Sequence, residues 1–322
     1  MQLLLENGIW FFSSLDNLLL FLRRGETFIN LGVVLFQVSV MKVSVVIPTY
    51  YRADDLSELF DGLLRQTVKP FEVIIVDDTP SNMISALCEQ YKTMFESVRS
   101  ELIYTRNTRE RSLIISRNLG VKSAGGELVM FLDSDVILYL NYIEKILEVF
   151  RKYPKALGVQ GWIANLEKGK LEYFRQILNR MFFLSHYAKD SCKFSEYPSI
   201  LTKIINCENL SGANMTFRRK VFDEFKFDEN VICMEDLLFS YSIFKKYPKG
   251  LFITPYAKCI HKTSKAGRVL SGRVESEDLE NLKNQYRKYI LVKLFGSKGV
   301  LLYCWQSIGI TIKLKGKVLK YT

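Results

Sequence analysis

Acidic residues follow two of the short apolar runs in this sequence, where their side chains could bind a cation and a polar ligand. Asp77 and Asp78 come directly after the run EVIIV, and the stretch from Asp133 to Asp135 comes directly after LVMFL. Four carboxylates in one crevice repel one another unless a positive charge lies among them. A hard divalent cation supplies that charge, and carboxylates and phosphate oxygens coordinate it together. The pattern therefore favours a metal site that binds a phosphate-bearing ligand, although each acidic pair alone could be incidental or cap a helix.

The elements that would position these residues alternate between strand and helix from residue 42 to about residue 162. Single helices between strands imply βαβ crossovers and a mainly parallel sheet, which binds ligands outside the carboxyl ends of its strands. We expect the first strand to end at Pro48, a later strand-like run (251–254) to end in a turn at Pro255, and Asp54 or Asp55 to cap the first helix. Apolar runs predict strands at 42–47, 72–76, 102–104 and 128–132, and helical periodicity predicts helices at 56–64, 84–95, 112–124 and 141–152.

Two common phosphate-binding patterns are absent from the sequence. No G-x-G-x-x-G follows the first strand, and no G-x-x-x-x-G-K-[ST] occurs in the chain. The usual dinucleotide-binding and P-loop proteins need those glycine-rich cradles. Any phosphate group must therefore be bound in another way.

Positive charge is concentrated at the C-terminus. The 322 residues include 45 basic and 34 acidic ones, but nine basic and no acidic residues lie from Lys283 onward, so the rest is nearly neutral. A basic segment interleaved with apolar residues favours an anionic membrane surface as a partner over nucleic acid. Residues 299–312 (GVLLYCWQSIGITI) are too few to span a bilayer. They are interpreted either as an interfacial segment or as a core helix folded back on the domain.

The cysteines and the first forty residues indicate the compartment in which the protein works and whether its N-terminus could cross a membrane. Six cysteines without a C-x-x-C pair, together with two histidines, argue against a zinc site and a disulfide framework, and so favour a reducing compartment. Charged residues interrupt the apolar clusters of residues 1–40, so no spanning helix is predicted there. This segment is interpreted either as an extension upstream of a start at Met41 or as a short membrane-associating arm.

Four segments, taken in order, resemble the core of the family 2 glycosyltransferases, and the resemblance covers about residues 43–262. It implies an α/β protein with the GT-A (Rossmann-like) fold, in which helices flank a mainly parallel central sheet, followed here by a helical C-terminal appendage. One departure is Leu113, because the family often has a glycine a few residues before the Arg-Asn pair; the loop near the sugar should differ in shape. The segments are VSVVIPTYYR (43–52), EVIIVDD (72–78), SRNLGVKSAGGELVMFLDSDV (116–136) and LSGANMTFRRKVFDEFKFDENVICMEDLLFSYSIFKKY (210–247).

The resemblance implies roles for residues that bind the nucleotide-sugar donor. Asp78 would bind the nucleobase, since a carboxylate only accepts hydrogen bonds and so suits an imide N–H. Asp133 and Asp135 correspond to the family's D-x-D pair, which touches the ribose and the metal, Mn²⁺ or Mg²⁺, that binds the diphosphate. His261 matches a further metal ligand in some relatives, although a lone histidine could equally be structural. Residues expected to line the donor site are Pro48, Tyr50, Arg52 and Arg117, the last of which could instead form a surface salt bridge.

The pair Glu235-Asp236 corresponds to the acceptor side of the family. Displacement at the anomeric carbon with inversion needs a carboxylate that takes the proton from the attacking hydroxyl. By resemblance Asp236 is the candidate base, and Glu235 would orient the acceptor. Both acids could instead only favour a helix N-terminus. His186 lies in an aromatic stretch and is interpreted as packing or as acceptor-site lining.

Together these inferences predict an inverting, metal-assisted glycosyltransferase that moves a sugar from a nucleotide diphosphate sugar to a glycan or lipid-linked acceptor at the cytoplasmic face of a membrane. The expected regions are an extension (1–40), a GT-A domain (41–265, divided into a nucleotide-sugar half, 41–136, and an acceptor half, 137–265) and a basic segment (266–322). One alternative, a sugar-phosphate nucleotidyltransferase, would need a glycine-rich basic loop after the first strand, which residues 48–52 do not form. The other is a non-enzymatic membrane or nucleic-acid binding module, whose function would depend on residues 283–322.

Overall fold

The computed structural model describes residues 4–6, 9–11, 41–165, 181–183, 202–262 and 276–318. The chain divides into two compact units, Met1–Met41 and Lys42–Thr322. In the first, β1 (Leu4–Glu6) and β2 (Ile9–Phe11) form an antiparallel pair. Of residues 1–40, which were interpreted as an extension or a membrane-associating arm, only these two strands are described, and His186 lies outside the described residues.

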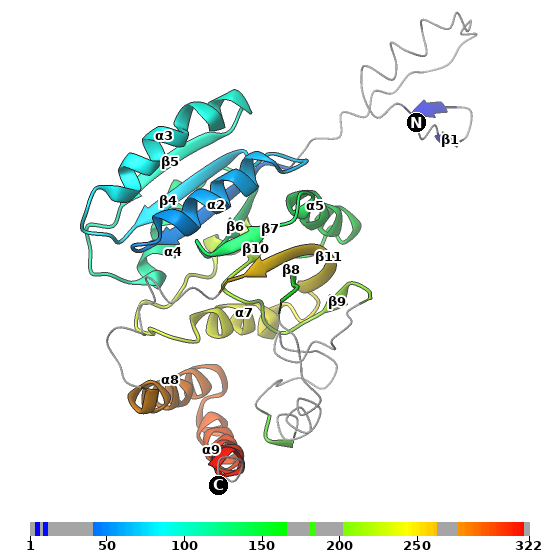
Figure 1. Cartoon of the computed structure of the whole chain (residues 1–322). Helices are drawn as coiled ribbons and strands as arrows, with labels where there is room; N and C mark the ends of the chain where they lie inside the picture. Colours follow the sequence, from blue (N-terminus) through cyan, green and yellow to red (C-terminus); the bar gives the residue numbers. More distant parts are fainter. Residues whose placement is uncertain are drawn as a thin grey trace, which may run out of the picture. The chain divides into compact units, whose positions relative to one another are not determined.

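Nine described strands of the second unit form one mixed sheet in the order β5-β4-β3-β6-β10-β8-β11-β7, with β9 paired to β11 (Figure 1). The first four neighbours, β5 to β6, are parallel, and β10 enters antiparallel between β6 and β8. The sheet is therefore mainly parallel on the side where the acidic residues were predicted to meet. The strands are β3 (Val43–Thr49), β4 (Glu72–Asp77), β5 (Glu101–Arg106), β6 (Leu128–Phe131), β7 (Val136–Leu138), β8 (Gly158–Ile163), β9 (Ile205–Asn206), β10 (Met215–Arg218) and β11 (Leu251–His261).

Helices cover both faces of the sheet, and the alternation of side chains along each strand divides the core between them. Val46 of β3 and Ile74 of β4 enter one buried cluster with Ile114 of α4, Phe239 of α7 and Ile290 of α8. Figure 1 shows α7 and α8 below the sheet and α2 and α3 above it. The helices are α2 (Ala53–Leu64), α3 (Met83–Ser97), α4 (Leu113–Ser123), α5 (Tyr142–Lys152), α7 (Glu235–Lys246), α8 (Ser276–Phe295) and α9 (Ser297–Val318), with a 3₁₀ helix at Arg219–Asp223.

Two prolines lie inside strands where the sequence predicted an end. β3 continues through Pro48 to Thr49. Proline has no backbone N–H, but the pairing of β3 with β6 stops at Val46, so no hydrogen bond to β6 is lost at Pro48. β11 likewise continues past Pro255, and its register with β8 shifts between Ile253 and Lys258. An irregularity of this kind lets a strand carry a residue that cannot donate. Both predicted strand ends were therefore wrong.

The predicted helix starts were also partly wrong. α2 begins at Ala53, so Asp54 and Asp55 lie in its first turn and not at the cap. Acidic side chains there still interact favourably with the positive end of the helix dipole. α3 begins at Met83, well after Asp77 and Asp78, so those two carboxylates do not cap it. For α4 the Ser112 side chain accepts a hydrogen bond from the Ile115 N–H and caps the helix.

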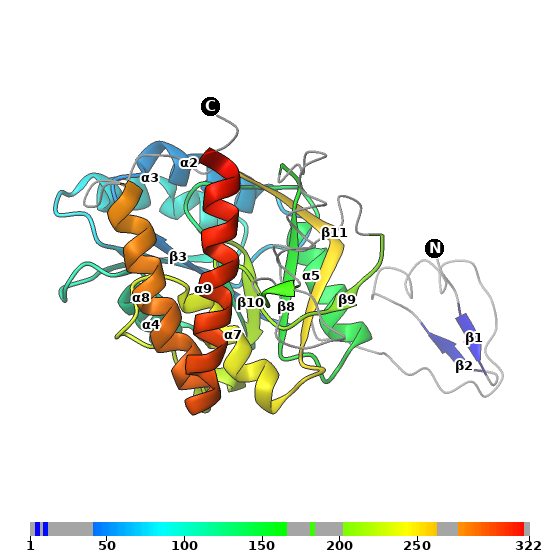
Figure 2. The same cartoon turned by 90° about the horizontal axis from the view of Figure 1, so that it is seen from below.

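The C-terminal helices α8 and α9 follow one another through Gly296, whose φ of 61° is a left-handed conformation that glycine adopts without strain. α8 is held against the rest of the unit by buried Ile290, Leu291 and Leu294, and by an ion pair of 2.5 Å between Lys293 Nζ and Asp228 Oδ2. Figure 2 shows α9 packed beside α8. None of the helices in the described residues is long and apolar enough to cross a membrane.

Candidate active site

A cleft of about 450 Å³ opens at the carboxyl ends of β3, β4 and β6. This is the edge of the sheet at which the sequence placed a ligand site, because parallel strands end there together. The N-terminus of α7 and the end of β11 close the other side. The cleft is lined by Pro48, Thr49, Tyr50, Arg52, Asp78, His261 and residues 111–114, 133–135 and 232–236.

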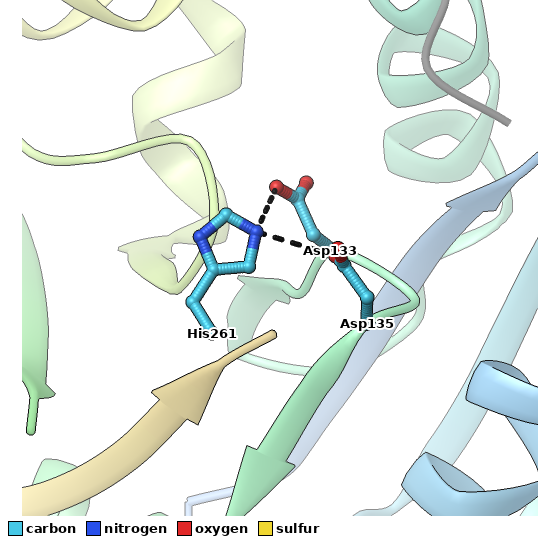
Figure 3. Close-up of side chains that lie close together, drawn as sticks. All are labelled: Asp133, Asp135 and His261. Carbon is cyan, nitrogen blue, oxygen red and sulfur yellow. Dashed lines mark ion pairs between the residues drawn. The ribbon is translucent and has the colours of Figure 1, made fainter. Parts of the chain in front are cut away.

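Three possible metal ligands, Asp133, Asp135 and His261, lie together in the cleft (Figure 3). His261 Nε2 is 3.2 Å from Asp135 Oδ1 and 3.6 Å from Asp133 Oδ2. The ligand atoms that the three residues offer all lie within 4.8 Å of one another. Carboxylate oxygens suit Mn²⁺ and Mg²⁺, and a neutral imidazole is a common metal ligand. The chemistry of this donor set therefore fits a divalent metal ion.

The pairing of β7 with β11 explains why His261 reaches the two aspartates. The two strands are antiparallel and His261 lies opposite Val136, the residue after Asp135. The Lys262 N–H then donates to the Asp135 carbonyl at 3.0 Å. Burial opposes protonation of His261, but the two adjacent carboxylates outweigh burial and raise the pKa of the imidazole. Burial also raises the pKa of Asp133.

Two arginines also lie against the aspartate pair. Arg52 Nη1 is 3.1 Å from Asp135 Oδ1, and Arg117 Nη2 is 3.6 Å from Asp133 Oδ1. From the sequence, a metal ion is the expected counter-charge for these carboxylates. The structure shows that the chain itself supplies part of the positive charge, from residues distant in sequence.

Asp78 and Asp77 have different surroundings although they are adjacent. Asp78 lines the cleft, and its carboxylate accepts hydrogen bonds from Asn107 Nδ2 at 2.6 Å and Ser116 Oγ at 2.9 Å. Burial raises the pKa of Asp78, and this effect outweighs the two hydrogen bonds, which lower it. Asp77 is fully buried and accepts from the Tyr104 hydroxyl at 2.9 Å, so it does not join the cleft. Three of the four predicted carboxylates therefore face the ligand site.

One wall of the cleft near Asp78 is made by Tyr50 and Arg111. The Arg111 guanidinium carbon lies 4.4 Å from the centre of the Tyr50 ring, a cation–π contact. Tyr51, the next residue, has a φ of 51°, and its N–H donates to Thr79 Oγ1 at 3.0 Å. This left-handed backbone is uncommon for a bulky residue and is held in place by the neighbouring loop.

Glu235 and Asp236 form the opposite wall, at the first turn of α7. Met234, just before them, has a φ of 61°, so the chain enters the helix through a strained turn. Asp236 Oδ2 accepts the Gly212 N–H at 2.9 Å and Oδ1 accepts the Leu237 N–H at 2.7 Å. Burial, and then the charge of Glu235, raise the pKa of Asp236 to about 6.

Arg117 lies in the interior and does not line the cleft. Its side chain is 1% exposed, and its Nη1 donates to Glu235 Oε1 at 2.6 Å while Nη2 donates to the Gly212 carbonyl at 3.0 Å. It is therefore not the surface salt bridge that was one interpretation of the sequence. Glu235, in turn, is held by this arginine, whereas Asp236 contacts backbone N–H groups.

A comparison with known families identifies the chain. The model of glycosyl transferase family 2 matches residues 44–226, more than half of the sequence. The chain belongs to glycosyltransferase family 2. The predicted family and the prediction of an enzyme are confirmed at this level.

Relatives and solved structures agree with this assignment. Glucosyl-dolichyl phosphate glucuronosyltransferase of Haloferax volcanii is 27% identical over 191 residues, covering 57% of this chain and 55% of that protein. The chain spans well under two thirds of the length of the other curated relatives it was compared with. Mannosyltransferase PcManGT of Pyrobaculum calidifontis, solved with GDP-Man and Mn²⁺, has a TM-score of 0.55 at 15% identity, covering 88% of this chain and 81% of that one. TarS 1–349 of S. aureus, solved with UDP-GlcNAc, has a TM-score of 0.54 at 19% identity, covering 83% and 71%. The predicted α/β GT-A fold is confirmed.

Some residues of this family 2 site were not predicted from the sequence. Asn107 follows β5 at the same sheet edge as Asp78, so the rule that strand ends carry ligand contacts could have found it. Ser116 sits one turn into α4, and nothing in its neighbours pointed to Asp78. Arg111 lies in a basic stretch, and its position over Tyr50 depends on how that loop folds.

Proposed function

We propose that the protein transfers a sugar from a nucleotide diphosphate sugar to a hydroxyl group of a glycan or lipid-linked acceptor, with inversion at the anomeric carbon. The observation that carries this proposal is the cleft itself, whose lining includes both Asp236 and the possible metal ligands Asp133, Asp135 and His261. Membership of family 2 supports the reaction class. Solved neighbours of the same fold bind GDP-Man with Mn²⁺ and UDP-GlcNAc, which supports the class of donor.

The donor would lie between Asp78 and the aspartate pair. Asp78 is pre-oriented by Asn107 and Ser116 and would accept the imide N–H of the base, since an ionised carboxylate only accepts. Pro48 and Tyr50 would wall the base, with Arg52 nearer the diphosphate. A divalent ion held by Asp133, Asp135 and His261 would neutralise charge on the leaving nucleoside diphosphate. Arg117 would keep Asp133 and Glu235 in position from behind.

Asp236 is the better candidate for the base than Glu235. Each Asp236 oxygen accepts one backbone N–H, and each keeps a second lone pair that could accept the acceptor's proton. A pKa raised to about 6 suits proton transfer near neutral pH. Glu235 Oε1 already accepts a hydrogen bond from Arg117 Nη1 at 2.6 Å, so this side chain is held in place by a buried ion pair. Glu235 would instead orient the acceptor hydroxyl.

The setting of the reaction is part of the proposal. The five described cysteines are all unpaired, which agrees with a reducing compartment and hence with the cytoplasmic face of a membrane. The name of the Haloferax volcanii relative includes glucosyl-dolichyl phosphate, a lipid-linked sugar, which supports a lipid-linked acceptor here.

A donor panel tests the proposal directly. The full chain is mixed with UDP-, GDP- and dTDP-sugars, with and without Mn²⁺, and thermal unfolding is followed. We expect one nucleotide class to raise the melting temperature, and only with the metal, because a ligand stabilises the state that binds it. Hydrolysis of that donor, which needs no acceptor, then provides the activity readout. No stabilisation by any nucleotide sugar in the presence of Mn²⁺ or Mg²⁺ would contradict the proposal.

A further inference from the structure

Helix α9 carries an apolar stripe that the described part of the chain leaves exposed over much of its surface. Leu301 is 74% exposed, Ile308 is 51% exposed and Trp305 is 44% exposed. Their spacing of four and three residues places them on one side of the helix, over about 10 Å of its length. Single exposed apolar residues are common on soluble proteins, but a contiguous stripe marks an interaction site.

The side of α9 that adjoins the stripe packs against residues 181–183, so the stripe has a defined orientation. Gln306 is 1% exposed and donates from Nε2 to the Phe183 carbonyl at 2.6 Å. The backbone at Gly309 approaches Phe182 so closely that an added Cβ would lie 2.3 Å from its ring. Within the stripe, one edge of Trp305 is anchored, because its Nε1 donates to the Met181 carbonyl at 3.0 Å, while 44% of the residue stays exposed. The helix therefore cannot turn its stripe inward without breaking these contacts.

Basic residues lie on both sides of the stripe along the sequence. Lys298 precedes Leu301 by three residues and is exposed, and α9 continues through positions 313, 315 and 317, all lysines. No acidic residue occurs from position 283 to the end of the chain. A partner of this surface must therefore be apolar where it meets the stripe and negatively charged around it.

We propose that the stripe of Leu301, Trp305 and Ile308 inserts into the interfacial region of an anionic lipid bilayer, with α9 lying in the plane of the membrane. Interfacial helices combine one apolar face with basic residues in this way, and tryptophan prefers the level of the headgroups. A second copy of the chain is disfavoured, since two such surfaces would bring like charges together. Nucleic acid offers no aliphatic surface for the stripe. This inference does not depend on which reaction the cleft performs.

Co-sedimentation with vesicles tests the proposal. The full chain is mixed with vesicles of phosphatidylcholine alone or with added phosphatidylglycerol, at low and high salt. We expect binding to the anionic vesicles that weakens at high salt, since the attraction of the lysines is screened beyond about 10 Å at 0.1 M. Changing all three stripe residues to glutamine (L301Q, W305Q and I308Q) should reduce partitioning by about tenfold or more, because each loses buried apolar area in the membrane.

A matched variant separates the stripe from general surface effects. Met83, Met94 and Leu140 are also exposed and apolar but lie outside the C-terminal helices, and their triple change to glutamine should leave vesicle binding unchanged. In the unaltered chain, lipids brominated in their acyl chains should quench tryptophan fluorescence, and Trp305→Phe should remove most of that quenching. Equal binding by both triple variants, or no binding by the unaltered chain, would overturn the proposal. So would a dimer, seen by sedimentation velocity, that the stripe variant alone dissociates.

Discussion

Arg117 Nη1 donates to Glu235 Oε1 at 2.6 Å, and this contact joins α4 to the first turn of α7 across 118 positions of sequence. Arg117 is 1% exposed, so it has exchanged hydration for contacts with the protein. Its other nitrogen lies 3.6 Å from Asp133 Oδ1. One buried cation thus links the side of the cleft that holds the candidate metal ligands to the side that carries the candidate base.

Arg117→Met should destabilise the protein and impair the cleft. Removing one partner of a buried ion pair leaves the other charge uncompensated, which costs about 3–5 kcal/mol. Arg117→Lys should be less harmful to stability but should still lower turnover, because lysine lacks the planar fork that reaches two partners. Urea unfolding and donor hydrolysis measure the two effects.

The matched control for Arg117→Met is Arg109→Met. Arg109 pairs with Glu229 at 2.7 Å, but both side chains are well exposed. Exposed ion pairs contribute little to stability because water screens them, so this variant should unfold almost like the unaltered protein. Equal losses in the two variants would mean that the buried bridge has no special role.

Asp78→Asn should weaken nucleotide binding without much loss of stability. Asn offers an N–H₂ group where the ligand's imide N–H needs an acceptor, and a lost hydrogen bond to a charged group costs about 1.5–3 kcal/mol, roughly 10–150-fold in affinity. The neighbouring change Asp77→Asn should lower stability and leave nucleotide affinity nearly unchanged. Asp77 accepts hydrogen bonds from the Tyr104 hydroxyl and the Thr79 N–H inside the fold. Calorimetric titration with the nucleoside diphosphate and thermal unfolding distinguish the two. If Asp78→Asn binds the nucleoside diphosphate as tightly as the unaltered protein does, Asp78 does not bind the nucleobase.

His261→Gln should reduce Mn²⁺ affinity by at least about tenfold, since even residues that only orient metal ligands are worth that much. Asp135→Ala should abolish metal-dependent donor binding, as should EDTA. Lys262→Gln is the matched control for His261, because Lys262 pairs with Asp55 and Glu58. Electron paramagnetic resonance of free Mn²⁺ measures the metal directly, without any need for donor or activity. Full-affinity donor binding in EDTA would rule out the metal assignment.

The sequence predicted the parts of this site that depend on one strand and its end. Asp78, Asp133 and Asp135 could be found because parallel strands finish at one edge of a sheet, whatever the rest of the chain does. The position of Arg117 could not, since its partners belong to segments about a hundred residues away. A local sequence pattern does not show which distant segments of the chain come together in the fold.

Strand order explains the other failures of prediction. β10 lies between β6 and β8 although it follows both in sequence, and the run Met215–Arg218 gave no sign of this insertion. Pro255 looked like the end of a strand, because the sequence does not show that β11 changes register there. His261 was placed next to Asp135 only by resemblance to relatives; the physical cause is the pairing of β11 with β7.

Removal of residues 1–40 should leave folding and donor binding intact. The chain divides into compact units at Met41, and every described strand of the large sheet lies after it. A chain that begins at Met41 should therefore keep its melting temperature and nucleotide affinity. Insolubility or loss of donor binding in the shortened protein, with the full chain active, would give the first forty residues a structural role.

Asp236→Asn should separate chemistry from binding. Asn keeps the size of the side chain but cannot accept a proton at neutral pH, so transfer should fall by about 10²–10⁴-fold, the usual contribution of a general base. In free energy this is about 3–5 kcal/mol, lost only in the transition state, so donor affinity should stay near that of the unaltered enzyme.

The pH profile of the unaltered enzyme provides the second readout for Asp236. Its pKa is raised to about 6, so the carboxylate is protonated and inactive as a base below that pH. Transfer should rise about tenfold per pH unit below pH 6 and level off above it. Asp236→Asn should lose this rise, whereas Glu235→Gln should keep it at a lower level, because Glu235 is already paired with Arg117. If transfer by Asp236→Asn stays within about threefold of the unaltered enzyme, well below the usual contribution of a general base, Asp236 is not the base and Glu235 becomes the next candidate.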